Sequence, residues 1–126
     1  YAHRDIINLM NKIRGPFNVN HVAQEAGIAA LRDKKHQLKA IKHNKYWLEK
    51  MKFKLSQLPI HVHDSRANFL LLDVGKNASK LNRFLLSKSI IVRTMEKYGL
   101  KNCIRVSIGK SKENIKLLEV MDRFYK

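Results

Sequence analysis

The sequence predicts an α/β fold in which an amino-terminal helical part leads into a small α+β domain. Through the first half of the chain, apolar residues recur at the three-or-four spacing of helices. Beyond Pro59 the pattern changes to short strand-like runs that alternate with helical stretches. The 126 residues amount to one domain's worth of chain. We therefore place a boundary near residue 58.

The composition indicates a folded protein with a strongly basic surface. It is 44% hydrophobic and 29% charged, and 26 Lys and Arg against 10 Asp and Glu give a net charge of +16. Such a charge is typical of proteins that bind polyanions, so a basic nucleic-acid-binding module is one alternative. The lysines are spread along the chain rather than concentrated, however, and we do not expect a nucleic-acid partner.

Cysteine content and hydropathy indicate a cytoplasmic protein. The single cysteine, Cys103, excludes an internal disulfide and favours a reducing compartment. No apolar run approaches the roughly 20 residues of a membrane span, so we expect no membrane association.

Three helices are predicted before Pro59. The first covers residues 4–14, and Gly15-Pro16 and the turn after it end the pattern. The second includes residues 22–31, whose small side chains favour close packing. The third runs over 34–58, where Pro59 stops it. Its expected core stripe consists of Leu38, Ile41, Leu48, Met51, Leu55 and Leu58.

The remaining chain predicts strands at 60–63 and 68–74 and helices at 78–88 and from Ser111 onward. We expect Leu81, Phe84 and Leu85 to face inward in the first of these helices. Ser111 is predicted to cap the last helix, with Glu113 in its first turn. The residues expected to pack this helix onto the sheet are Ile115, Leu117, Leu118, Val120, Met121 and Phe124.

Two further runs place two arginines on neighbouring strands. Ile90, Ile91 and Val92 predict a core strand that leads into Arg93, and Tyr98-Gly99 supplies a turn. Alternation in the next run puts Ile104, Val106 and Ile108 on one side, and Cys103, Arg105 and Ser107 on the other.

Arg93 and Arg105 on one face would form an anion receptor. A guanidinium binds carboxylate or phosphate through two parallel hydrogen bonds. The alternative is that both are edge arginines that reach into water.

No other motif indicates a reaction centre. Gly109-Lys110-Ser111 resembles the end of a phosphate-binding loop, but Ile104 stands where that motif requires glycine. Ser107 and Lys110 satisfy Ser-x-x-Lys, a pattern too short to support acylation chemistry. His61-x-His63 offers two metal ligands without a third nearby, and zinc needs three or four, so we predict no metal site.

Four blocks of sequence, in this order, resemble the histidinol-phosphate aminotransferase family, pyridoxal-phosphate enzymes with the aspartate-aminotransferase fold. Glu113-Asn114 follows the last block, as in that family. The blocks are Arg-Gly-Pro-Phe-Asn-Val-Asn (14–20) with Ala23-Gln24 and Ala29-Ala30-Leu31, Ser-Arg-Ala-Asn-Phe (65–69), Ile-Ile-Val-Arg (90–93) with Met95, and Tyr-Gly-Leu (98–100) through Ile-Arg-Val-Ser-Ile-Gly (104–109).

The resemblance implies that this chain is the carboxy-terminal portion of a fold-type-I aminotransferase. Residues 1–32 would then be the end of the large cofactor domain and the interdomain segment, 33–58 the long linking helix, and 59–126 the small α/β domain. The family's Schiff-base lysine would lie upstream of Tyr1-Ala2. No catalytic residue is therefore assigned here, and the chain alone is not expected to be active.

The resemblance also implies ligands and partners. Pyridoxal 5'-phosphate would be bound mainly by the upstream domain, and Arg105 and Arg93 would bind the anionic group of histidinol phosphate or of glutamate and 2-oxoglutarate. Arg14, Asn18 and Asn20 would lie at the active-site entrance or a subunit contact of a homodimer in histidine biosynthesis. An aromatic aminotransferase and an amino-acid-phosphate decarboxylase are alternatives within the same fold.

Two residues depart from the family pattern. Ser89 stands where a glycine usually precedes Ile-Ile-Val-Arg, and Lys101 stands where proline often follows Tyr-Gly-Leu. Both are turn positions, so the departures concern loop geometry rather than the arginines.

Overall fold

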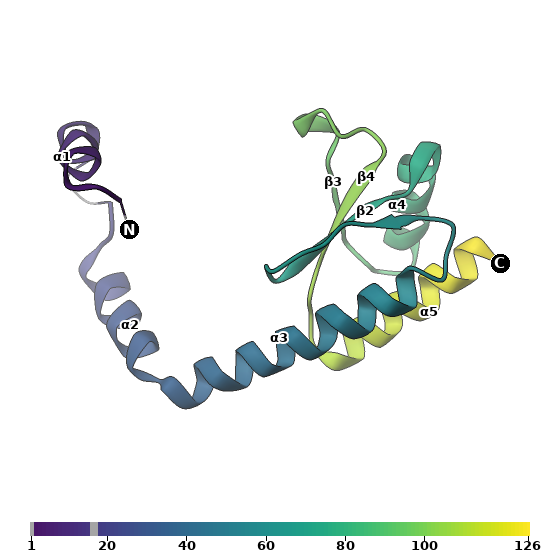
Figure 1. Cartoon of the computed structure of the whole chain (residues 1–126), viewed down its shortest axis with the longest axis horizontal. Coiled ribbons are helices and arrows are strands. Elements are labelled where there is room, and N and C mark those ends of the chain that lie inside the picture. Colours follow the sequence, from purple (N-terminus) through teal and green to yellow (C-terminus); the bar gives the residue numbers. More distant parts are fainter. Residues whose placement is uncertain (1, 16–17) are drawn as a thin grey trace. The chain divides into compact units, whose positions relative to one another are not determined.

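A computed structural model of the chain describes residues 2–15 and 18–126. The chain forms two compact units, an amino-terminal unit (Tyr1–Leu38) and a carboxy-terminal unit (Lys39–Lys126). Figure 1 shows the elements of both. Each unit is described by itself.

The amino-terminal unit contains helices α1 (Arg4–Ile13) and α2 (His21–Arg32), which confirms the first two predicted helices. The turn predicted at residues 16 and 17 lies outside the described residues. Neither helix has a buried residue among those described, so the expected close packing of α2 is not formed within this unit. The exposed apolar side chains include Ile6, Leu9, Met10, Ile13, Val22 and Leu31.

Helix α3 (Lys34–Leu55) ends three residues before the predicted position. The residue before a proline disfavours the α conformation, and here the chain tightens so that Leu58 N–H donates to Leu55 C=O at 3.1 Å. The predicted core stripe holds only in the second half of the helix, because Leu38 and Ile41 are 58% and 63% exposed. The buried residues of α3 are Trp47, Met51 and Leu55.

The carboxy-terminal unit is built on a four-stranded antiparallel sheet in the order β1-β2-β4-β3. Its strands are β1 (His61–Val62), β2 (Phe69–Asp73), β3 (Arg93–Thr94) and β4 (Cys103–Ser107). The alternation predicted for β4 is confirmed from Ile104 to Ser107, since Ile104 and Val106 are buried, Arg105 is half-buried and Ser107 is exposed. Cys103, which was predicted on the side of Arg105, is also buried.

Strand β3 is shorter than predicted, because residues 90–92 are not part of it. Ser89 has a positive φ of 58°, its N–H donates to Leu86 C=O, and Ile90 N–H donates to Leu85 C=O. These bonds form a Schellman motif, which ends the preceding helix and withholds the Ile90 N–H from any strand. Ile91 is 86% exposed instead of lying in the core.

Helices α4 (Ala78–Ser87) and α5 (Ser111–Tyr125), together with residues 39–55 of α3, pack on one face of the sheet (Figure 1). Short 3-10 turns lie at Gly75–Asn77 (η1) and Glu96–Tyr98 (η2). The core combines residues of the sheet and of the three helices: Met51, Leu55, Leu70, Leu72, Leu81, Leu85, Ile104, Val106, Leu117 and Met121.

Two expectations for α5 were wrong. The residue at the cap position is Lys110, whose N–H donates to the Glu113 carboxylate at 2.7 Å. Ser111 instead accepts a hydrogen bond from Trp47 Nε1 at 3.2 Å, which ties α5 to α3. Ile115 is 45% exposed and does not pack on the sheet.

Candidate anion-binding site

Arg93 and Arg105 are direct partners in the ladder between β3 and β4. Paired residues of antiparallel strands project to the same face, so the predicted juxtaposition is present. Leu71 is the partner of Arg105 on the other side, in β2. The opposite face carries the buried side chains that contact the helices. The two arginines therefore lie on the face away from the helical layer.

Both arginines line a cavity of about 730 Å³. Its walls are the chain from Ser89 to Arg93, the end of β4 and the first turns of α5. Ser107, which is exposed and lies on the same sheet face as Arg105, also lines this cavity. Two arginines and a serine are therefore among the residues that surround one cavity.

The Arg105 side chain is half-buried and held by an aromatic ring. Its guanidinium carbon lies 5.1 Å from the ring centroid of Phe69. Its Nε is enclosed and has no hydrogen-bond partner in the described part of the chain. Among the described residues, neither Arg105 nor Arg93 forms an ion pair with a carboxylate. Glu113 lines the same cavity, but its carboxylate accepts from Lys110 N–H rather than pairing with either arginine.

Arg93 is held differently. It is exposed, its Nη2 donates to the Tyr98 hydroxyl at 2.6 Å, and its guanidinium carbon lies 5.2 Å from the same ring. Tyr98 closes the η2 turn, after which Gly99 takes a left-handed φ of 79°. The predicted turn is confirmed, but no pattern in the sequence predicted the contact between Tyr98 and Arg93.

The turn from β4 into α5 is fixed by a buried asparagine. Asn114, 2% exposed, accepts from Gly109 N–H at 2.9 Å and donates to Gly109 C=O at 3.0 Å. His43 Nε2 donates to the same carbonyl at 2.9 Å. A Cβ on Gly109 would lie 2.5 Å from the Glu113 carboxylate, so a larger residue there would displace the side chain that caps α5. Sequence analysis missed Asn114 and His43 as contributors to the site.

The three other predicted site residues belong to the amino-terminal unit. Arg14 is the C-cap of α1, and its N–H donates to Met10 C=O at 3.0 Å. Asn20 caps α2 by accepting from Ala23 N–H at 2.9 Å, and Asn18 is exposed. Their role at an entrance or subunit contact stays a prediction.

The remaining candidate groups form no second centre. The rings of His61 and His63 meet edge to face at 4.6 Å, and no cluster of three metal-ligating side chains occurs in residues 2–15 and 18–126. Asp64, beside them, pairs with Lys52, whose hydrogen bond and charge lower the pKa of the carboxyl. Burial raises the pKa of the Cys103 thiol, and Asp73 adds to the rise.

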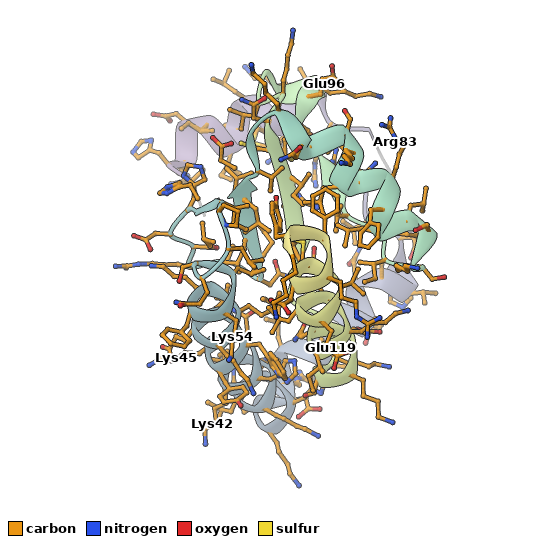
Figure 2. The ribbon with its side chains drawn as sticks, turned by 90° about the vertical axis from the view of Figure 1, so that its right-hand side faces the viewer. Lys42, Lys45, Lys54, Arg83, Glu96 and Glu119 are labelled. Atoms are coloured by element: carbon orange, nitrogen blue, oxygen red, sulfur yellow. The ribbon has the colours of Figure 1, made fainter. Side chains whose placement is uncertain are left out.

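The described lysines are all exposed. Figure 2 shows Lys42, Lys45 and Lys54 on the outside of α3, and Glu119 lies on α5. None of the described lysines lies in an enclosed environment. Within the described stretches, none of the helices has both the length and the apolar character required to cross a bilayer.

Residues 1–121 match the family model described as aminotransferase class I and II. The chain belongs to this family. The histidinol-phosphate aminotransferase of Pelagibacter ubique is 40% identical over 129 residues, which are 99% of this chain and 36% of that protein. The corresponding enzyme of Maricaulis maris is 34% identical over 130 residues, again 36% of its length.

Solved structures of the family agree with the fold. The chain superposes on a histidinol-phosphate aminotransferase from Sinorhizobium meliloti, solved in complex with pyridoxal-5'-phosphate, with a TM-score of 0.76. The two share 25% identity, and the match covers 93% of this chain and 34% of that structure. This aminotransferase chain therefore spans about a third of the length of the relatives that it matches.

Proposed function

We propose that this chain forms the carboxy-terminal part of a pyridoxal-phosphate-dependent histidinol-phosphate aminotransferase and supplies its substrate-anion receptor. The names of the relatives support the enzyme class and the reaction. The observation that carries the receptor is the cross-strand pair Arg93 and Arg105, which lines one cavity without a carboxylate partner.

The receptor fits the two half-reactions of such an enzyme. Histidinol phosphate presents a phosphate, whereas glutamate and 2-oxoglutarate present a carboxylate. Two guanidinium groups can bind the oxygens of either anion through charge-assisted hydrogen bonds. Because both substrates are anionic, one receptor can serve both.

The chain's own residues do not fit the anchoring of the cofactor. A lysine that forms a Schiff base requires desolvation or a nearby cation, and the described lysines are exposed. When bound, pyridoxal phosphate supplies the electron sink for amino transfer. We assign its binding and the Schiff-base lysine to an upstream domain, and to this chain the orientation of the substrate.

The proposal also covers the domain organisation and the assembly of the complete enzyme. Residues 1–32 would complete a large cofactor domain, 33–58 would link the domains, and 59–126 would form the small domain. The complete enzyme would be a cytoplasmic homodimer in histidine biosynthesis, with Arg14, Asn18 and Asn20 near the entrance or the subunit contact. The exposed apolar side chains of α1 and α2 support a covered environment for these helices.

Substitution of Arg105 in the complete enzyme tests the proposal. Arg105→Ala should lower kcat/KM for histidinol phosphate and for glutamate about a hundredfold, because two charge-assisted hydrogen bonds are lost. Arg83→Ala is a matched control, since Arg83 lies exposed on α4 (Figure 2). Unchanged kcat/KM for both substrates in Arg105→Ala would rule out the receptor.

A further inference from the structure

We infer that Phe69 is a positioning residue for Arg105, holding the guanidinium ready for an anion without neutralising its charge. The inference rests on the proposed function of Arg105 as the substrate-anion receptor. Phe69 is an apolar residue, so the sequence alone does not indicate that it takes part in anion binding.

Phe69 is placed by its position in the sheet. It opens β2, and its ladder partner in β4 is Ser107, two residues from Arg105. Such diagonal neighbours on one sheet face lie within reach of aromatic side chains. The Phe69 ring accordingly lies 5.1 Å from the guanidinium carbon of Arg105.

The backbone around Phe69 is fixed on both sides. Ser65 Oγ donates to Phe69 C=O at 2.6 Å and accepts from Ala67 N–H at 3.1 Å. Ile108 N–H donates to Asn68 C=O at 2.8 Å, which extends the ladder to β4. The ring therefore belongs to a rigid strand and turn rather than to an adaptable loop.

The chemistry explains why a ring suits this position. A carboxylate beside Arg105 would hold the guanidinium but would also compete with a substrate anion for its hydrogen bonds. An aromatic face attracts a cation through the ring quadrupole and leaves the in-plane N–H donors free. The Arg105 side chain forms no hydrogen bond within the described chain, and its Nε is enclosed, so a ligand would have to be bound by the terminal nitrogens.

Arg93 and Arg105 differ in exposure and in hydrogen bonding, so we infer different roles for them. One donor of Arg93 is already bound to the Tyr98 hydroxyl at 2.6 Å, and the side chain is exposed. Arg105 is half-buried and has no hydrogen-bonded side-chain partner among the described residues. Arg105 supported by Phe69 is therefore the principal arm of the receptor.

Kinetics of the complete enzyme test this inference. Phe69→Leu keeps an apolar side chain but removes the quadrupole, and should raise KM for histidinol phosphate about three- to thirtyfold with little change in kcat. Phe69→Tyr restores the ring and should return KM to within about twofold of the wild type. If the leucine variant fails to fold, Phe69→Met provides the same contrast.

A double substitution distinguishes positioning of Arg105 by Phe69 from a general loss of structure. In an Arg105→Ala background, Phe69→Leu should leave KM unchanged, because the ring acts only through the guanidinium. An equal increase in both backgrounds would overturn the inference. The control Phe84→Leu removes a ring of α4 that contacts Phe124 at 5.3 Å, and it should lower Tm without raising KM.

The two proposals can fail separately. If Arg105→Ala raises KM and Phe69→Leu does not, the inference about Phe69 falls and the receptor stands. If Arg105→Ala itself leaves KM for both substrates unchanged, the receptor falls and the role of Phe69 falls with it.

Discussion

Arg93 and Arg105 face each other directly across the β3 and β4 ladder, so two guanidinium groups share one cross-strand position. Like charges placed directly opposite destabilise a sheet. Each side chain is instead held against an aromatic ring, Tyr98 for Arg93 and Phe69 for Arg105. The ladder thus pairs two residues of like charge, and an anionic ligand would offset that charge.

Removal of one of the two charges should stabilise the unliganded protein. Arg93→Gln is expected to raise the free energy of unfolding by about 0.5 kcal/mol at low salt, with a smaller gain at 0.5 M salt because of screening. Urea denaturation at the two salt concentrations measures the change. Arg83→Gln, a substitution of an exposed arginine on α4, is the control, and an equal gain there would refute local repulsion.

Ser89→Gly should stabilise the protein. Ser89 occupies the left-handed C′ position of a Schellman motif with a φ of 58°, where a side chain costs about 1 kcal/mol relative to glycine. We expect the free energy of unfolding to rise by about 0.5 to 1 kcal/mol. The gain is smaller than the full cost of the side chain, because glycine also raises the entropy of the unfolded chain. Ser87→Gly, at the last residue of α4, should instead lower the free energy of unfolding, because Ser87 has helical backbone and its hydroxyl donates to Phe84 C=O. A loss of stability in Ser89→Gly would contradict the motif.

Asn114→Ala should destabilise the turn between β4 and α5. It removes both hydrogen bonds to Gly109 from a side chain that is 2% exposed. The expected loss is about 2 to 3 kcal/mol of unfolding free energy, because Gly109 N–H loses its partner. Urea denaturation of Asn114→Ala should be compared with Asn102→Ala, at an exposed position, where a change below about 0.5 kcal/mol is expected. An equal change in unfolding free energy for the two variants would show that the hydrogen bonds between Asn114 and Gly109 do not stabilise the protein.

Cys103 should react slowly with thiol reagents. Burial raises the pKa of its thiol above the usual 9.0, with Asp73 as a second cause, so the reactive thiolate is scarce at neutral pH. Because the folded pKa is raised, this contribution to stability is complete below about pH 9 and is lost as pH rises through the folded value. Labelling with a chromogenic disulfide at pH 8, with and without urea, measures the protection. Labelling of the folded chain at the rate of free glutathione would contradict it.

Much of the fold could be predicted because its signals are local. Periodicity located the five α-helices of the described residues and the two longer strands, β2 and β4, and alternation in β4 placed Arg105 opposite the core. The predictions were wrong where residues outside a segment determine the backbone conformation of that segment. Residues 90–92 read as a strand, but the Schellman motif at Ser89 determines their backbone.

The candidate site could be predicted only in part, for the same reason. The juxtaposition of Arg93 and Arg105 follows from two short alternating runs. The supporting contacts join residues far apart in the chain, such as Phe69 with Arg105 and His43 with Gly109, and no spacing rule encodes them. The exposure of Leu38 likewise could not be read from its place in an apolar stripe.

The carbonyl of Gly109 accepts hydrogen bonds from His43 of α3 and from Asn114 of α5. This oxygen lies four residues beyond Arg105, at the end of the same strand and turn. A shift of α3 must either break the bond from His43 or carry the turn along with it. The long helix is therefore mechanically coupled to the rim of the pocket, through this carbonyl and through the bond from Trp47 to Ser111.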